Sequence, residues 1–347
     1  MKRSLTILIL LGTFLGGCSI SFTSSKRVDG GIFRSTDFGE TWEQRVFVGT
    51  EKKKTLTISA VDVSGIYFSP ADPESMVITT YASGLYHSTD AGGTWVKDGL
   101  RAANVTAFVF DPSSPTIQYA GSGPNIYKTT DGGPTWDIIY TDTRGEGMSA
   151  LYVNTAEPST VLAVTSSGTI LKSTNYGVEW KVLTSIGDSI KFLFPSRQDA
   201  NRLYALTNSR GLFRSLDGGQ NWKELDGLRQ YPGAEQVNWL TASPFFPDTV
   251  YVATNYGILK SVNGGDAWAP IKTLIPFGTV PIKTVAVDPI DSKIIYFSVE
   301  HLLHRTDDGG QTWKTIESIP TSRRIQRLVT HPTQPGVLFF GTLLVKK

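Results

Sequence analysis

The sequence is poor in cysteine and in net charge. Its 347 residues contain one Cys, 3 Met and 4 His, and a hydrophobic fraction of 40% argues against a disordered chain. A single Cys excludes an internal disulfide framework and a Cys-rich zinc site. The formal charge of +2 vanishes if Lys2 and Arg3 are removed, because the other basic residues then equal the 31 acidic ones. We therefore expect no nucleic-acid partner.

Long hydrophobic runs are also missing. Residues 5–15 form an apolar run of about ten residues, which is too short to span a bilayer. The run follows the positive start of residues 1–3, and this arrangement is typical of a secretory signal. No later apolar stretch reaches about 18 residues, so we expect the rest of the chain to lie outside the bilayer.

The single cysteine follows this signal directly. The small pair Gly16-Gly17 before Cys18 resembles a bacterial lipoprotein box. The resemblance implies that residues 1–17 are removed and that Cys18 is lipidated, with Ser-rich residues 18–29 as a tether. The protein would then be exported and anchored to the cell membrane or, as Ser19 favours in a two-membrane bacterium, to the outer membrane. An ordinary signal peptide with an unmodified Cys is the alternative.

Seven copies of one motif dominate what remains. The pattern is Ser/Thr-x-Asp/Asn-x-Gly-x-x-Trp, and successive copies start 41 to 53 residues apart. This period is typical of one four-stranded propeller blade. We call each copy a repeat turn. The acidic or amide positions are Asp37, Asp90, Asp131, Asn175, Asp217, Asn263 and Asp308, and the aromatic positions are Trp42, Trp95, Trp136, Trp180, Trp222, Trp268 and Trp313.

The residue types of the repeat turn indicate a structural role. Asp or Asn can accept hydrogen bonds from backbone amides just ahead, Gly supplies a positive φ, and Trp opens the next strand over apolar surface. Asn175 and Asn263 occupy the acidic position, and an amide keeps the acceptor oxygen without the charge. A hydrogen-bonding role survives this exchange and general acid catalysis does not. We expect no metal and no cofactor at these turns.

Each repeat turn follows the same order of strands and turns, and helical periodicity is nowhere sustained. The sequence predicts an all-β fold, a seven-bladed β-propeller of four-stranded antiparallel blades over residues 30–347. Residues 31–47 contain only a third and fourth strand, and residues 325–341 only a first and second. We expect these ends to pair in one blade and close the ring, which removes exposed sheet edges. Residues 342–347 could instead begin a further strand.

The predicted topology sorts the loops onto two faces. First-to-second turns and repeat turns share one face, while blade-to-blade and second-to-third loops share a variable face, where binding usually resides. Alignment of the innermost strands puts Lys191, Trp239, Thr284 and Arg327 in one column. Packing between blades is the alternative role for this column. The candidate ligand-binding residues are Lys191, Trp239, Lys283, Arg327, Arg210 and Tyr256.

Catalytic sets are hard to find in this sequence. Sialidases need an arginine triad and six blades, and the chain lacks the Arg-Ile-Pro segment before its first repeat. Candidate acids without a recognisable partner are Glu146, Asp188, Glu235 and Glu300. His301 and His304 are three apart in a strand and point to opposite faces, which argues against a metal pair. Lys52 to Lys54 are expected to form a solvated loop.

The repeat turn resembles the Asp-box, or bacterial neuraminidase repeat. The resemblance covers nearly all of the mature chain and extends to sortilin-type ectodomains and the photosystem II assembly and stability factors. It implies a non-catalytic, membrane-anchored extracytoplasmic propeller that binds a protein or glycan through its variable face. The assembly-factor family would add a patch of arginines, suggested here by Arg323, Arg324 and Arg327. The alternatives are an assembly or stability factor for a membrane complex and a sialidase- or xyloglucanase-like glycoside hydrolase.

Overall fold

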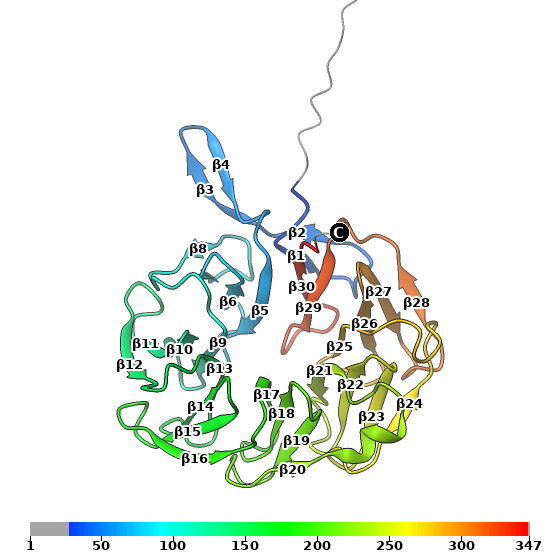
Figure 1. Ribbon diagram of the computed structural model, residues 1–347. Coiled ribbons are helices and arrows are strands. Elements are labelled where there is room, and N and C mark those ends of the chain that lie inside the picture. The colour runs from blue at the N-terminus through cyan, green and yellow to red at the C-terminus, as the bar shows by residue number, and fades with distance from the viewer. Residues whose placement is uncertain (1–27, 346–347) are drawn as a thin grey trace, which may run out of the picture.

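The computed structural model describes residues 28–345, so the predicted signal, Cys18 and most of the tether lie outside the described residues. Within this range the chain is all-β and forms a ring of seven four-stranded antiparallel sheets (Figure 1). The predicted seven-bladed propeller is confirmed. The one helical element in the described range is the short 3-10 turn η1, Asp226–Gln230, and no helix there is long and apolar enough to cross a membrane.

Six blades are each built from four consecutive strands, and the first strand of each is innermost. Blade 2 holds β5 (Val63–Phe68), β6 (Met76–Thr80), β7 (Leu85–Ser88) and β8 (Val96–Lys97), and blade 3 holds β9 (Ala107–Asp111), β10 (Ser114–Ser122), β11 (Asn125–Thr129) and β12 (Asp137–Thr141). Blade 4 holds β13 (Met148–Val153), β14 (Val161–Thr165), β15 (Thr169–Ser173) and β16 (Lys181–Ser185).

The second half of the ring repeats this plan. Blade 5 holds β17 (Ile190–Pro195), β18 (Leu203–Thr207), β19 (Leu212–Ser215) and β20 (Lys223–Glu224). Blade 6 holds β21 (Val237–Ala242), β22 (Val250–Thr254), β23 (Ile258–Ser261) and β24 (Ala269–Ile271), and blade 7 holds β25 (Thr284–Val287), β26 (Ile295–Val299), β27 (Leu302–Thr306) and β28 (Lys314–Ile316). The apolar core lies between neighbouring blades, as where Leu206 and Leu225 of blade 5 join Val250 and Val252 of blade 6.

The remaining blade, blade 1, joins the two ends of the chain. Its order is β29 (Arg324–Thr330), β30 (Leu338–Leu343), β1 (Ile32–Ser35) and β2 (Glu43–Gln44). The β1–β30 ladder runs from Ile32 opposite Gly341 to Ser35 opposite Leu338. The predicted closure is therefore confirmed, and β30 itself extends to Leu343. Since β29 also packs beside β5 and β25, the ring is continuous.

All seven repeat turns share one hydrogen-bond geometry. The Asp or Asn oxygen accepts a bond from the backbone N–H four residues later, at 2.8–3.1 Å. The hydroxyl of the first residue donates to the same oxygen at 2.7–2.9 Å. Asn175 and Asn263 make these bonds as the aspartates do, which fits an acceptor role without charge. At Asp131, bonds from Thr135 and Thr129 lower the carboxyl pKa to about 2.

Each repeat turn also rests on the first turn of its own blade. In every blade one backbone N–H of the repeat turn donates to a carbonyl of the first-to-second turn, at 2.7–3.0 Å. The Phe38 N–H donates to Gly336 O in this way, which ties residues from opposite ends of the chain. The two kinds of turn therefore occupy one face of the ring, as predicted, and the blade-to-blade loops occupy the other.

Asp90 offers a test of this acceptor role. We expect Asp90→Asn to change the free energy of unfolding by less than about 0.5 kcal/mol, because the amide oxygen can accept the bonds of Ser88 and Thr94. We expect Asp90→Ala to lower it by about 1–2 kcal/mol, because both donors lose their partner. Urea unfolding followed by tryptophan fluorescence measures both. Equal losses in the two variants would show that the charge matters.

The register of the innermost strands corrects the predicted column. A β-bulge in β17 pairs Phe192, and not Lys191, with Leu206 of the second strand. The same kind of bulge pairs Trp239 with Ala253 and leaves Asn238 unpaired. Because a one-residue slip in a strand sends a side chain to the opposite face, Lys191 leaves the column and Phe192 enters it. The column of these four blades is Phe192, Trp239, Thr284 and Arg327.

The segment between blades 1 and 2 is a hairpin where a solvated loop was expected. Strands β3 (Phe47–Glu51) and β4 (Lys54–Thr57) project outward from the rim (Figure 1). Their two-residue connection, Lys52-Lys53, has φ values of 47° and 67°. Two positive φ values are the mark of a type I′ turn, which strongly prefers Asn-Gly. A left-handed conformation costs a residue with a Cβ about 1–2 kcal/mol. The expected loop is therefore wrong, because the segment forms a hairpin, but the lysines are exposed as a solvated segment requires.

The strain at this turn is open to measurement. We expect the double variant Lys52→Asn, Lys53→Gly to raise the free energy of unfolding by about 1 kcal/mol, because both residues tolerate positive φ. The double variant Lys52→Arg, Lys53→Arg keeps the strained backbone and should leave it unchanged. Urea unfolding of the three proteins checks this, and a stability loss in the Asn-Gly variant would contradict the strain.

Candidate functional site

The centre of the ring holds a cluster of four side chains from three blades. Arg327 of β29 places its guanidinium carbon 4.7 Å from the ring centre of Phe192 and 4.6 Å from that of Trp239. Phe192 and Trp239 meet edge to face at 5.3 Å, and Phe194 approaches the other side of Trp239 at 5.0 Å. Blade 1 is not a neighbour of blades 5 and 6, so Arg327 reaches across the ring to make these contacts. We call Arg327, Phe192, Trp239 and Phe194 the central cluster.

Arg327 is an unusual buried cation. Its exposed fraction is 7%, and Nη1 donates to Gln326 O at 2.9 Å. Within residues 28–345 no carboxylate lies within 4 Å of its nitrogens. Burial lowers the pKa of the guanidinium, and Tyr81 and Tyr67 nearby oppose this shift. Buried charges are normally paired, so the two aromatic faces substitute here for a counter-ion. The cation is therefore available to an acceptor that enters the centre of the ring.

The other two arginines of the expected patch are already paired. Arg323 bridges Asp29 at 3.4 Å and Asp62 at 3.2 Å, and Arg324 pairs with Glu300 at 3.0 Å. These bridges fasten loops of the variable face to one another. The three arginines thus have different roles, and only Arg327 lacks an acidic partner in the described chain.

Two lysines from the predicted set lie at the start of innermost strands, where the blade-to-blade loops enter. Lys191 is exposed, and half-buried Lys283 has its pKa lowered by burial and by Arg324. Between their blades, Asn238 donates to Asn255 Oδ1 at 3.0 Å and to Ile282 O at 2.8 Å. These residues give the variable-face side of the central cluster a polar, basic surround.

Arg210 and Tyr256 make their contacts elsewhere. Arg210 pairs with Glu224 and lies 4.8 Å from the ring centre of Phe213, all within blade 5. Tyr256 stacks on Phe277 at 4.8 Å and lies 5.3 Å from Tyr231. None of these partners belongs to the central cluster. The predicted set therefore divides into a central part, Trp239 and Arg327, a surround, Lys191 and Lys283, and two separate loop positions.

Phe192 and Phe194 are the members of the cluster that sequence reasoning missed. The sequence does contain a signal for them, because three consecutive aromatic or apolar residues follow Lys191 in the innermost strand of blade 5. Phe192 follows the bulge in its strand as Trp239 and Arg327 do in theirs, so the sequence alignment placed blade 5 one residue out of step with the other blades.

The candidate acids are held in structural bonds or stand alone. Asp188 accepts the backbone N–H groups of Ser209 and Arg210, both at 2.9 Å, and its pKa is lowered. Glu146 also has a lowered pKa, with a bond from Ser167 as the largest cause. These shifts are opposite to what a general acid requires. Burial raises the pKa of Asp98 to about 6, but its carboxylate lies buried beneath Trp136.

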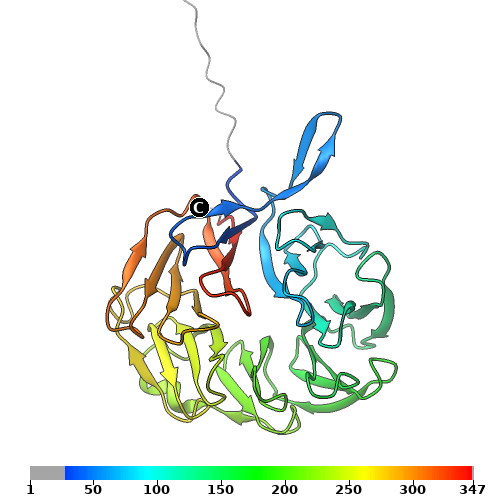
Figure 2. The ribbon, with the colours of Figure 1, turned by 180° about the vertical axis from the view of Figure 1, so that it is seen from behind.

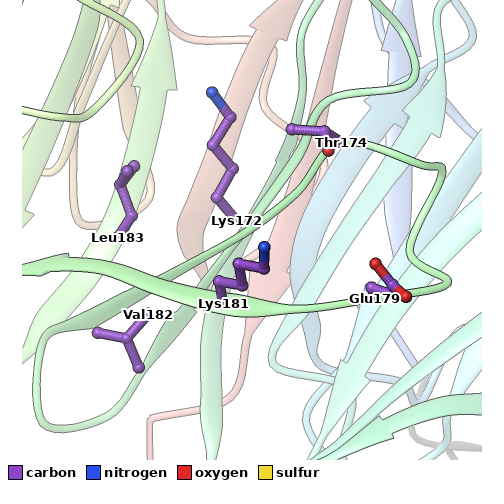
Figure 3. A pocket seen from close by; sticks show the side chains of 6 residues that line it. All are labelled: Lys172, Thr174, Glu179, Lys181, Val182 and Leu183. Carbon is purple, nitrogen blue, oxygen red and sulfur yellow. The ribbon is translucent and has the colours of Figure 1, made fainter.

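A surface hollow and a buried histidine are the other candidate sites. A hollow of about 280 Å³ lies on β15 and β16 at the outside of blade 4, bordered by Lys172, Thr174, Glu179, Lys181, Val182 and Leu183 (Figure 3). It has no aromatic wall. His304 is buried and stacks on Phe297 at 4.5 Å. In the described part of the chain no three His, Cys, Asp or Glu residues are grouped so as to hold a metal ion.

Comparison with known proteins fits this architecture. Residues 32–45 match the BNR-Asp box repeat. The chain thus has one match to this repeat, in blade 1, within a propeller of seven blades. A xyloglucanase of Acetivibrio thermocellus is 30% identical over 144 residues, which cover 32% of this chain and 16% of the enzyme. The chain thus spans about one sixth of this curated relative.

Solved structures share the fold of this chain. A structure described as YCF48 bound to D1 peptide aligns with a TM-score of 0.63 at 17% identity, over 83% of this chain and 94% of that one. YCF48 from Cyanidioschyzon merolae gives 0.61 at 18%, over 81% and 96%. The GH74 xyloglucanase from Xanthomonas campestris gives 0.64 at 17%, over 81% of this chain and 51% of the enzyme. At these identities the likeness establishes the fold alone.

The stacking of Arg327 is the contact to test first. We expect Arg327→Lys to lower the free energy of unfolding by about 1 kcal/mol, because an ammonium cannot lie flat against both Phe192 and Trp239. The tryptophan emission should shift as well, since one of the eight tryptophans loses its cationic neighbour. Urea unfolding and fluorescence spectra measure this. Unchanged values in both would mean that Arg327 is not stacked in solution.

Proposed function

We propose that this protein is a non-catalytic, membrane-anchored extracytoplasmic propeller that binds a polypeptide partner over the central cluster, from the variable face. The observation that carries the proposal is Arg327, a buried cation held between two aromatic rings without a carboxylate partner in the described chain. A carboxylate or a backbone carbonyl of a partner would complete its bonding. Lys191 and Lys283 would attract an acidic segment toward it.

Two further observations support a polypeptide ligand. Phe192, Phe194 and Trp239 offer aromatic surface beside the cation, and aromatic residues and arginine are enriched where proteins bind one another. YCF48, which shares the fold over most of its length, has been solved with a peptide bound. An assembly or stability factor for a membrane complex is one form that this function could take.

Glycoside hydrolysis is the second candidate, favoured by the 30% identity to a xyloglucanase over part of the chain. The carboxylates argue against it. Glu300 is paired with Arg324, while Asp188 and Glu146 have lowered pKa values. A glycosidase needs one acid with a raised pKa facing a second carboxylate across the substrate.

Photo-cross-linking in the native membrane tests the proposal. A benzophenone residue at position 191 should capture a polypeptide, and the same residue at position 181, in the hollow on blade 4, should not. Arg327→Lys should reduce the yield at position 191 by about tenfold, since a buried charged hydrogen bond is worth roughly 1.5–3 kcal/mol. Equal capture from both positions, or xyloglucan turnover that Glu235→Gln abolishes, would overturn it.

A further inference from the structure

The β3–β4 hairpin carries a basic tip that the proposed function does not use. We propose that Lys52, Lys53 and Lys54 form a second membrane contact, which binds the phosphate groups of anionic phospholipid and fixes the orientation of the anchored ring. The inference rests on the proposed membrane anchor. It adds a surface and a ligand class to the rim of the propeller, away from the central cluster.

The backbone of the tip is the first argument. Lys52 and Lys53 both have positive φ, at positions where Asn and Gly are strongly preferred. A strained conformation persists when something else is gained, and such strain is concentrated at functional sites. What lysine supplies here and Asn-Gly cannot is charge. The turn places two ammonium groups at the farthest point of a projecting hairpin.

The charge of the tip is the second argument. Lys52, Lys53 and Lys54 are all exposed, and among residues 28–345 no carboxylate lies within 4 Å of their amino groups. Glu51 pairs with Lys54 in the strand register, so it offsets part of the charge without forming an ion pair. Arg323 and Arg324, by contrast, are engaged in ion pairs. The tip is thus a free cationic point on a protein whose mature charge is balanced.

The position of the hairpin selects a membrane as its partner. Its base lies against the residues where the described chain begins, because Gly30 N–H donates to Ser59 O at 3.0 Å and Gly31 is packed on Val46 and Ile58. Both views show the hairpin leaving the rim beside the blade that joins the two ends of the chain (Figures 1 and 2). If Cys18 is lipidated, residues 18–29 can span at most roughly 40 Å. A hairpin whose longer strand, β3, has five residues reaches roughly 17 Å from the rim toward the same bilayer.

The proposed lipid anchor also explains why three lysines are enough to hold the hairpin tip at the membrane. Each lysine near an anionic surface contributes only a modest, salt-sensitive attraction, so the tip would bind vesicles weakly on its own. Once a tether holds the ring at the membrane, the second contact is intramolecular and its effective concentration is high. Two contacts at one sector of the rim fix the ring's orientation, which one tether alone cannot do.

The single cysteine allows a direct experiment. A protein of residues 18–347 is coupled through the Cys18 thiol to a maleimide lipid in vesicles of phosphatidylglycerol or of phosphatidylcholine. Lysine acetylation is then followed residue by residue by mass spectrometry. On phosphatidylglycerol at low salt, we expect acetylation of Lys52, Lys53 and Lys54 to slow by at least about threefold, with recovery at 0.5 M salt. Exposed Lys272 and Lys293, from other blades, should react equally on both lipids.

Matched variants separate charge from structure. In Lys52→Arg, Lys53→Arg the remaining Lys54 should stay protected, and in Lys52→Asn, Lys53→Gly it should lose protection. The second variant relaxes the turn, so unfolding cannot explain its loss. Protection on phosphatidylcholine, protection of Lys54 in the Asn-Gly variant, or equal protection by a free oligonucleotide would each overturn the proposal. The maleimide replaces the natural anchor, so a native Cys18 found without lipid would refute the anchor and leave this measurement valid.

Discussion

The pairing of β1 with β30 is the contact on which the rest of the molecule depends. It joins residues 32–35 to residues 338–341 and turns a row of seven sheets into a ring. Without it, blade 1 would be two separate hairpins, and the innermost strands of blades 2 and 7 would lose the neighbour on which they pack. Closure also brings Arg327, near the end of the chain, to the centre of the ring opposite Phe192 and Trp239. The candidate site therefore exists only in the closed form.

The repeat turns serve this closure in a repetitive way. Each turn satisfies its own backbone through one Asp or Asn oxygen and then donates a backbone bond to the first turn of its blade. In blade 1 that bond runs from Phe38 to Gly336, so the same local motif ties the two ends together. Because the stability of this face is provided locally, the opposite face is free to vary. The loops there differ in length, charge and aromatic content.

The two functional proposals concern two separate places on the ring, its centre and its rim. Arg327 is a buried cation that two aromatic rings accommodate, whereas Lys52 and Lys53 are exposed cations on a strained turn. In both places the chain keeps a positive charge although burial or backbone strain makes it costly in free energy. A propeller bound by its rim to a membrane, with its central cluster open to a polypeptide, would suit a partner that also lies in or on that membrane.

The sequence by itself determined the architecture, because seven turns of the same residue types can be recognised without knowledge of what surrounds them. It also determined closure, since residues 31–47 and 325–341 each lack the other half of a blade. Only the tertiary structure decided the site. The paired register of blade 5 puts Phe192, and not Lys191, in the column that holds Trp239 and Arg327, and register is a property of the paired strands rather than of the residue types. The contacts of Arg327 depend on ring closure, which pairs residues more than three hundred positions apart in the chain.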